Sequence, residues 1–434
     1  MFFDRQYIFL YNDDIAMRQT TLFTKTRKEA PKDEVARNAI LLIRAGYIYK
    51  EMAGVYAYLP LGLRVFRNIE KIIREEMNAT GAQELLLTSL QSPIVWEKTG
   101  RFSDTVIDNW FKTKLADETT IGIANTHEEP LTNLLTHYAH SYRDFPLYVY
   151  QFQTKFRNEL RAKSGIMRGR EFVMKDLYSF CRTEEEHAAF YMRMKAAYTN
   201  VFNRAGIGEQ TYFTYASGGS FSKASDEFQT VTDAGEDTIY VDPETRLSIN
   251  EEMMADEGVF EKFHTSKEKL VAKKSVEVGN IFPLGTRFSE AFGLMCRDEA
   301  GNESPVIMGS YGIGLGRLMG TIAEVCSDDK GLRWPKEVAP FRAHLVRLGE
   351  GENVVAAADR VYEELSRSGV EVLYDDRSGV SAGEKFADAD LLGMPTRIVM
   401  SEKTLAAQTV ELRDRTSGEV IMVPSGELAA QLRM

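Results

Sequence analysis

Two predicted strands joined by a basic loop constrain the fold of this chain more than any other segment. Residues 147–157 alternate enough for a strand, and residues 171–180 follow a glycine-containing loop as a second strand. The first strand ends on Phe156-Arg157-Asn158-Glu159. Arg157 provides a planar, permanently charged group for a phosphate, and Glu159 faces the same side two residues later. A motif this short also fits a surface ion pair, so the hairpin alone does not define a function.

The loop between these strands is rich in lysine and arginine. Basic residues outnumber acidic ones between 155 and 175, although the whole chain has a formal net charge of −11. The returning strand begins with Arg168-Gly169-Arg170-Glu171-Phe172, so glycines and aromatic rings interleave with the charges. A run of charges is commonly a solvated face, but this mixture favours a hairpin that faces phosphate.

A glycine-rich segment lies about 150 residues further on. Alternating glycines from Gly309 to Gly316 lead into Arg317 and an apolar helix predicted over 318–326. Glycines let the backbone approach a nucleotide closely, and Arg317 is then placed to reach its phosphates. A dinucleotide-binding fold is the rival interpretation. It fails on spacing, because G-x-G-x-G-R is not G-x-G-x-x-G and no βαβ unit with a ribose-binding acid follows.

A polar cluster, Thr126-His127-Glu128-Glu129, precedes a helix predicted over 130–140. Such a cluster is either a helix N-terminus with acids in its first turn or a site where a carboxylate holds a substrate amine. We expect His127 to be either a solvent-exposed residue or a residue that supports the site, rather than a base.

The region after 335–340 predicts a separate α/β domain. Strands and helices alternate there in a βαβαβ order. The predicted elements are strand 344–348, helix 354–368, strand 370–374, helix 382–392 and strand 397–401. Elsewhere the patterns predict helices over 33–50, 63–77 and 184–205, the last capped by Thr183, a buried strand over 85–90 and irregular strands over 105–124.

Length and composition exclude several classes of protein. A chain of 434 residues exceeds one ordinary core, so two domains are expected. No stretch is apolar enough for a membrane span, and the first residues lack a secretory signal, which indicates a cytoplasmic protein without a membrane partner. The three cysteines, Cys181, Cys296 and Cys326, are too far apart for a zinc site, and no protein-bound metal is expected.

Together the motifs resemble those of class II aminoacyl-tRNA synthetases and, within that class, of bacterial-type prolyl-tRNA synthetases. The resemblance runs from Met17 to the C-terminus. Besides the motifs above, it includes LIRAG at 42–46, YLPLG at 58–62, GIMRGREFVMKDLYSF at 165–180, EVG at 277–279, GTR at 285–287, GLRWPKEVAP at 331–340, DDR at 375–377 and the block from Gly383 to Pro395.

The resemblance implies a fold of the α/β class with two domains. The catalytic domain, residues 17–340, has the antiparallel sheet of class II synthetases flanked by helices, and residues 341–434 form an α/β anticodon-binding domain. Residues 1–16 are an N-terminal extension. The segment 233–274 is too short for the large editing insertion of many bacterial relatives, so no editing in cis is expected.

The implied reaction is activation of L-proline with ATP and Mg²⁺, followed by transfer of proline to tRNA(Pro). A homodimer is expected, with no DNA partner. Arg157 and Arg317 are the implied catalytic residues. The implied proline-binding residues are Thr126, Glu128, Arg157 and Ser310; the ATP-binding residues are Arg157, Glu159, Arg168, Phe172 and Arg317; and the anticodon-binding residues are Arg377, Lys385 and Arg413.

The chain departs from the family pattern at several positions. Thr88 stands where a proline is usual, Asn125 stands where a proline precedes Thr126, and Asp226 stands where a histidine is expected near the substrate proline. The loop sequence Arg161-Ala162-Lys163-Ser164 replaces R-P-R-F. These departures leave an alternative open, namely a synthetase-like paralogue that binds tRNA without charging it. A threonine enzyme is disfavoured because its zinc ligands are missing, and a histidine enzyme because its arginine motif is not found.

Overall fold

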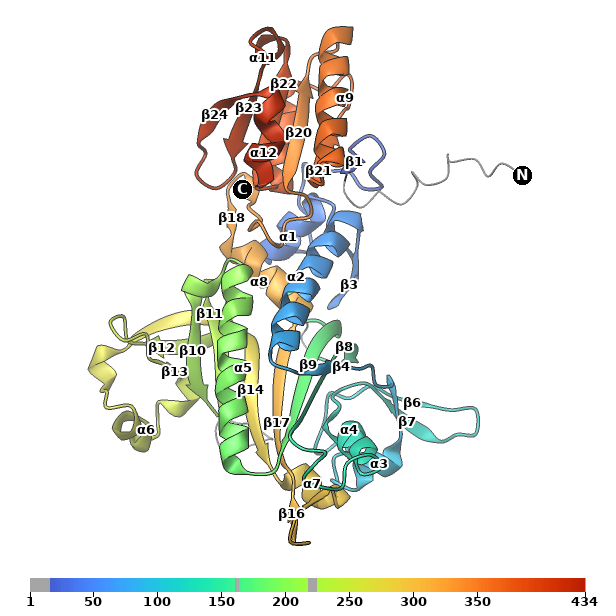
Figure 1. Ribbon diagram of the computed structural model, residues 1–434, viewed down its shortest axis with the longest axis vertical. Helices are drawn as coiled ribbons and strands as arrows, with labels where there is room; N and C mark the ends of the chain where they lie inside the picture. The colour runs from blue at the N-terminus through green and yellow to red at the C-terminus, as the bar shows by residue number, and fades with distance from the viewer. Residues whose placement is uncertain (1–15, 161, 163, 218–224, 434) are drawn as a thin grey trace.

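The computed structural model describes residues 16–160, 162, 164–217 and 225–433, and these form two domains stacked along the long axis of the molecule (Figure 1). The larger domain contains a nine-stranded sheet, and the smaller C-terminal domain contains a six-stranded sheet. The predicted α/β fold with an antiparallel sheet in the larger domain is confirmed.

The large sheet is mainly antiparallel, and the predicted hairpin lies within it. Its strand order is β11-β10-β13-β12-β14-β17-β9-β8-β4. Strands β8 and β9 pair along their whole length, with Leu147 opposite Phe180 and Phe156 opposite Glu171. The strands are β4 (Gln83–Glu84), β8 (Leu147–Phe156), β9 (Glu171–Cys181), β10 (Thr211–Ala216), β11 (Ser225–Val231), β12 (Asp237–Val241), β13 (Ser248–Asn250), β14 (Val271–Gly285) and β17 (Ile307–Gly314).

Three helices, α2 (Pro60–Ala79), α5 (Glu184–Arg204) and α8 (Leu315–Val325), cover one face of this sheet. Their apolar stripes form the main core, as the helical periodicity predicted. The predicted cap of α5 is present, because the Thr183 side chain accepts a hydrogen bond from the Glu186 amide. The helices leave the opposite face of the sheet open for a site.

Two predicted elements of the large domain are wrong in extent. Residues 33–50 do not form one helix: α1 (Arg37–Arg44) is followed by Gly46 at φ 72° and by the hairpin of β2 (Ile48–Met52) and β3 (Val55–Tyr58). The segment 85–90 is not a buried strand, because Leu86 is 73% exposed and only Leu90–Gln91 pair, as β5. In the first segment the apolar residues Leu41, Leu42, Tyr47 and Ile48 are all buried, but the turn at Gly46 divides them between a helix and a strand. In the second segment the apolar pattern does not correspond to burial.

The remaining elements of the large domain are short. The helix predicted over 130–140 is α4 (Glu128–Leu135), and the irregular strands over 105–124 include β6 (Lys112–Lys114) and β7 (Thr120–Ile123) in a three-stranded sheet with β5. The others are α3 (Pro93–Glu97), η2 (Gly165–Met167), η3 (Gly208–Gln210), α7 (Arg287–Phe292), β15 (Met295–Arg297), β16 (Glu303–Pro305), β18 (Ser327–Asp328) and β19 (Gly331–Leu332).

The segment 233–274, predicted to replace an editing insertion, is a small ordered lobe at one edge of the large sheet. It contains β12, β13, η4 (Glu251–Met253), α6 (Glu257–Lys262), η5 (Lys267–Lys269) and the start of β14. Ile249, Val259 and Leu270 form its own small core.

The C-terminal domain has the predicted βαβαβ order. The sheet order is β1-β21-β20-β22-β23-β24, and β20 pairs in parallel with both β21 and β22. The elements are β20 (Ala343–Leu348), α9 (Glu352–Arg367), β21 (Val372–Asp375), α10 (Ala382–Leu392), β22 (Thr396–Ser401), α11 (Glu402–Ala406), β23 (Thr409–Asp414), β24 (Val420–Pro424), η6 (Ser425–Glu427) and α12 (Leu428–Arg433).

The first strand of the chain differs from the predicted division into domains. Strand β1 (Ala16–Arg18) pairs with β21, so this segment belongs to the sheet of the C-terminal domain and not to that of the large domain. The rest of the predicted extension, residues 1–15, lies outside the described residues, as do Arg161 and Lys163. Among the helices of the described residues, none has both the length and the apolarity that a membrane crossing requires.

Candidate active site

A cavity of about 390 Å³ opens on the face of the large sheet that α2, α5 and α8 leave free. Its walls come from β9, β14 and β17, from the loop before β9 and from the start of α4. All eight side chains assigned to proline and ATP from the sequence line this one cavity: Thr126, Glu128, Arg157, Glu159, Arg168, Phe172, Ser310 and Arg317.

Strand alternation explains why residues far apart in the sequence meet here. Every second residue of β9 from Phe172 to Tyr178 points to the cavity, and Ser310, Gly312 and Gly314 do so on β17. A Cβ atom at Gly312 would lie 2.4 Å from the Met174 methyl carbon. The glycines of the predicted phosphate-facing segment therefore keep the floor of the cavity open.

Arg157 differs from Arg168 and Arg317, the other two arginines that line this cavity. Among the described residues its guanidinium forms no hydrogen bond or ion pair, its Nε atom is buried, and it lies 5.4 Å from the centre of the Phe172 ring. Burial, followed by the charge of Arg317, lowers the pKa of Arg157. Since buried donors are nearly always satisfied, this guanidinium is arranged for an external anion.

Glu128 is held as an acceptor at the other end of the cavity. Its two carboxylate oxygens accept hydrogen bonds from Thr126 Oγ1 at 2.5 Å and from the Tyr178 hydroxyl at 3.3 Å. The next residue, Glu129, points away from the cavity toward Arg101, at 2.8 Å. Burial raises the pKa of Glu129 to about 7. Of the two adjacent acids, only Glu128 is therefore placed to meet a substrate amine.

Of the two roles expected for His127, the structure excludes the solvent-exposed one and supports the other, because the residue lies behind the cavity wall. Its side chain is fully buried, with Nε2 3.0 Å from the Thr88 carbonyl oxygen and Nδ1 2.5 Å from Lys155 Nζ. An ammonium group only donates, so Nδ1 accepts and Nε2 carries the proton. Burial lowers the pKa of His127 to about 4. Lys155 also pairs with Asp176, which lines the cavity, so the imidazole positions the cavity wall.

Arg317 and Arg168 are paired with acids at the edge of the cavity. Arg317 Nη1 donates to the Glu277 carbonyl at 3.0 Å and to its carboxylate at 3.1 Å. Helix α8 begins at Leu315, three residues earlier than predicted, so Arg317 lies in its first turn. Arg168 pairs with Glu159 at 2.9 Å and with Glu236 at 3.1 Å. Both arginines are thus held in place before any nucleotide binds.

The structure adds acids to the site that the sequence reasoning missed. Glu227 and Glu277 line the cavity together with Asp176 and Tyr178. Burial, followed by the nearby charge of Glu277, raises the pKa of Glu227 to about 8. Glu277 belongs to the EVG segment at 277–279, for which the family resemblance implies no specific role.

Asp226 does not lie near the predicted proline site. Its carboxylate accepts a hydrogen bond from the Tyr191 hydroxyl of α5 at 2.6 Å, and it does not line the cavity. Strand alternation turns Glu227 to the cavity and Asp226 to the helices. The departure at this position therefore changes the helix side of the sheet and not the walls of the cavity.

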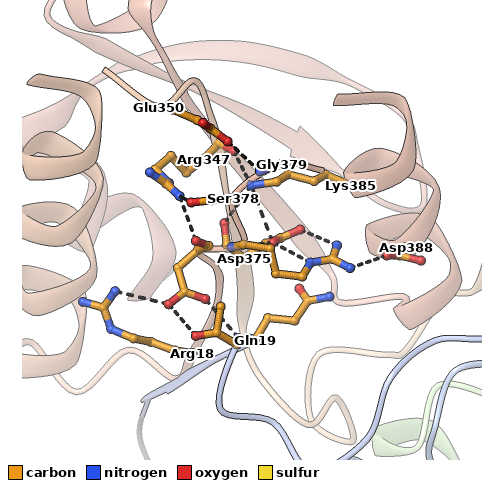
Figure 2. A network of polar contacts seen from close by, with 12 residues as sticks. Arg18, Gln19, Arg347, Glu350, Asp375, Ser378, Gly379, Lys385 and Asp388 are labelled. Atoms are coloured by element: carbon orange, nitrogen blue, oxygen red, sulfur yellow. Dashed lines mark hydrogen bonds and ion pairs between the residues drawn. The ribbon is translucent and has the colours of Figure 1, made fainter. Parts of the chain in front are cut away.

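The three predicted anticodon-binding residues lie in the C-terminal domain but in different surroundings. Arg377 makes a two-pronged contact with Asp375, at 2.9 and 2.7 Å, and pairs with Asp388 at 2.9 Å (Figure 2). The Lys385 side chain is 4% exposed and donates to the Arg347 carbonyl at 2.8 Å. Direct contact of Lys385 with RNA is at odds with this burial. Arg413 lies half-buried on β23.

Two family models match the chain, and together they cover most of it. "tRNA synthetase class II core domain (G, H, P, S and T)" matches residues 110–326, and "Anticodon binding domain" matches residues 339–434. Among solved structures, the prolyl-tRNA synthetase of Cryptosporidium parvum with halofuginone and AMPPNP has a TM-score of 0.77 at 17% identity, covering 91% of this chain and 76% of that one. The Giardia lamblia prolyl-tRNA synthetase in complex with prolyl-adenylate has a TM-score of 0.75 at 18% identity, covering 90% and 74%. These two likenesses concern the fold.

Sequence relatives cover nearly the whole chain. The proline–tRNA ligase of Rickettsia rickettsii (strain Sheila Smith) is 37% identical over 427 residues, which are 94% of this chain and 99% of that protein. The proline–tRNA ligase of Rhodopseudomonas palustris (strain BisA53) is 38% identical over 440 residues, 96% and 100% of the two chains. The protein therefore belongs to the proline–tRNA ligase family of class II aminoacyl-tRNA synthetases.

Proposed function

We propose that this protein activates L-proline with ATP to form prolyl-adenylate and then transfers proline to the 3′ end of tRNA(Pro). The observation that carries the proposal is the single cavity lined by all eight side chains assigned from the sequence. The relatives that span the chain are named proline–tRNA ligases. The cavity has an amine acceptor, Glu128, at one end, and among the described residues Arg157 has no ion pair or side-chain hydrogen bond. This arrangement suits an amino acid joined to a nucleotide.

In this proposal Glu128 and Thr126 bind the imino group of proline. The Glu128 carboxylate is only 2% exposed, and a secondary ammonium has two protons to donate to it and to a neighbouring oxygen. Ser310 lies on the cavity floor and contributes a hydroxyl to the same pocket. Arg157 receives the proline carboxylate with its free donors.

The nucleotide lies on the other side of Arg157. Phe172 stacks against adenine and Glu159 accepts from its amino group, while Arg168 holds Glu159 in place and contacts the phosphates. Arg317, in the first turn of α8, pairs with the γ-phosphate. Arg157 thus spans the proline carboxylate and the α-phosphate, where the new bond forms.

The chemistry needs positioning and fixed positive charge more than proton transfer. A carboxylate oxygen of proline attacks the α-phosphorus in line with the leaving pyrophosphate, and the P–O bond to pyrophosphate breaks. A ribose hydroxyl at the 3′ end of tRNA then attacks the carbonyl carbon of the adenylate, and AMP leaves. Arg157 stabilises the charge that accumulates on the α-phosphate in the first step.

The acids of the cavity fit the Mg²⁺ that the family uses with ATP. Mg²⁺ is commonly held by one or two carboxylates together with substrate phosphates. Glu227 and Glu277 meet this description, because they face the same cavity and the charge of Glu277 disfavours ionisation of Glu227. A bound divalent cation supplies charge neutralisation to the phosphates.

Other properties complete the proposal. Leu86, Leu90 and Ile94 are 73%, 59% and 69% exposed, which supports a homodimer formed through this surface. The lobe at 233–274 has a core of only a few residues, which supports the absence of cis hydrolysis of mischarged alanyl-tRNA. Arg413 and Arg377 are the proposed anticodon contacts, and the cytoplasm is the proposed compartment.

ATP–pyrophosphate exchange with each of the twenty amino acids, at matched concentrations and with Mg²⁺, tests the proposal. Exchange that depends on proline supports it. Exchange with another amino acid would change the substrate, and no exchange with any amino acid from folded protein would favour the alternative, a tRNA-binding paralogue that does not charge.

A further inference from the structure

The N-terminal segment 16–27, here called the strap, begins as part of the anticodon-binding domain. Strand β1 pairs in parallel with β21, with Ala16 opposite Val372 and Arg18 opposite Tyr374 (Figure 1). The Gln19 amide extends this ladder by donating to the Tyr374 carbonyl at 2.7 Å. The strap therefore completes the sheet of a domain whose other strands lie more than 300 residues later.

Side chains of the strap converge on Asp376, the residue beside Arg377. The amide and hydroxyl of Thr20 donate to the two carboxylate oxygens of Asp376, at 3.0 and 2.8 Å. Arg18 lies 3.5 Å from the same carboxylate (Figure 2) and 3.0 Å from Asp359. The Arg18 guanidinium also lies 5.0 Å from each of the Tyr362 and Tyr374 rings. Asp376 is thus held by three donors from the strap.

The opposite side of the same loop is held by the C-terminal domain itself. Arg347 donates to the Asp376 carbonyl at 2.7 Å, and Asp375 grips Arg377 in a two-pronged contact (Figure 2). Arg377 also forms an ion pair with Asp388. The Asp388 carboxylate in turn accepts a hydrogen bond from the Thr26 hydroxyl of the strap, at 2.7 Å. The strap therefore contacts both of the carboxylates, Asp376 and Asp388, that border Arg377.

The far end of the strap is anchored in the catalytic domain. Leu22 belongs to the main core of that domain and is only 8% exposed. The Thr24 hydroxyl donates to the Gly46 carbonyl at 3.2 Å, and the Arg27 amide donates to the Arg44 carbonyl at 2.8 Å. The strap consequently adds to the other contacts between the domains, such as the hydrogen bond from the Tyr47 hydroxyl to the Leu392 carbonyl at 2.7 Å and the ion pair of Asp328 with Arg415 at 2.7 Å.

We propose that the strap is a positioning device for tRNA recognition: through Asp376 and Asp388 it sets the loop that presents Arg377, and it fixes that loop relative to the active site. This inference rests on the proposed function, because it concerns the second, tRNA-dependent step. The strap does not contribute to the cavity that binds proline and ATP. Its disruption uncouples the two steps: activation of proline persists and charging of tRNA falls.

Two substitutions test this role against two readouts. T20V removes the hydroxyl contact, one of the three donor contacts with Asp376, with little change of shape. D376N weakens all three donor contacts while keeping the side-chain volume. We expect proline-dependent pyrophosphate exchange within about twofold of wild type for both. We expect the kcat/KM for tRNA(Pro) charging to fall several-fold in T20V and about tenfold or more in D376N, as for lost charge-assisted hydrogen bonds.

The direction of the D376N effect separates positioning from simple electrostatics. D376N removes a negative charge beside a surface that meets RNA, so electrostatics alone would strengthen tRNA binding. A gain in charging by D376N would overturn the proposal, as would an equal loss of exchange and charging. R27A is the matched control, because Arg27 is an exposed arginine of the same segment whose hydrogen bond to the Arg44 carbonyl is made by its backbone amide. R27A must charge like wild type.

Failure of this proposal differs from failure of the proposed function. If wild-type protein shows no proline-dependent exchange, the function is wrong and the strap has no charging reaction to position. If wild type exchanges and charges while T20V and D376N match it in both assays, the function stands and the positioning role falls. Should D376N not fold, as judged by thermal melting, T20V alone decides the question.

Discussion

Substitution of Arg157 by alanine should separate activity from stability in this enzyme. Proline carboxylate and α-phosphate would each receive a charge-assisted hydrogen bond from the guanidinium, worth about 1.5–3 kcal/mol apiece. Loss of one preorganised donor to developing charge costs about 3 kcal/mol in known enzymes, or about 100-fold in rate. We therefore expect R157A to lose at least about 100-fold in proline-dependent pyrophosphate exchange.

The same substitution should not destabilise the protein. Within the described residues Arg157 has no ion pair or hydrogen bond to lose, and burial beside Arg317 lowers its pKa, so its charge opposes folding. The melting temperature of R157A without substrates should equal or exceed that of wild type. R143A, at an exposed surface arginine, is the control and should retain full exchange. Exchange by R157A within about threefold of wild type, or a loss matched by a fall in melting temperature, would refute this reasoning.

Three further predictions concern the cavity. G312A should lower exchange several-fold without unfolding the protein, because its Cβ would lie 2.4 Å from the Met174 methyl carbon and would displace that flexible side chain within the cavity. G383A, where a Cβ meets open space, should be active. The pKa of Glu227 is raised to about 8, so the folded protein keeps a proton that the unfolded chain loses near pH 4.3. The stability of the folded protein therefore falls as the pH rises between these two values. E227Q should melt at a higher temperature than wild type at pH 8 and at the same temperature at pH 4. His127 should give the nitrogen NMR shifts of a neutral, Nε2-protonated imidazole at pH 7, and H127Q should raise the KM for proline more than the KM for ATP; a protonated ring or equal changes in both constants would contradict the positioning role.

The hairpin and the glycine-rich segment were predictable because their signals are local. Alternation in residues 147–157 and 171–180 specifies two strands, and a basic glycine-containing loop between them leaves an antiparallel hairpin as the simplest connection. Once the hairpin is known, alternation also decides which residues share a face. The predicted set from Arg157 to Phe172 therefore reached the cavity as a group, and Ser310 joined it by the same rule on β17. Arg317 reached the cavity from the first turn of α8, which follows β17 directly.

The missed features depend on contacts between distant segments. Glu227 faces the cavity and Asp226 faces α5 because β11 pairs with both β10 and β14, which fixes its register. A prediction that shifts the register of such a strand by one residue places every side chain on the wrong face of the sheet. Strand β1 joins β21 across more than 350 residues, and three residues carry too little pattern to choose a partner. Lys385 is similar, because a lysine near a predicted RNA surface gives no sign of burial until the Asp375 side chain beneath it is known.

Charge placement in the cavity gives an argument for ATP that does not depend on any motif. On one side, Arg157 has no direct ion pair among the described residues, and its proximity to Arg317 disfavours its charge. On the other side, Glu227 is kept protonated at neutral pH by burial and by Glu277. An anion alone would relieve the repulsion between the two arginines and leave that between the two acids. A cation alone would relieve the repulsion between the acids and leave that between the arginines. A polyphosphate together with a divalent cation relieves both at once, because the phosphates meet the arginines and the cation meets the acids. Wild-type protein should therefore gain more thermal stability from ATP and Mg²⁺ together than the sum of the gains from each alone, and R157A should lose that excess while E227Q reduces it.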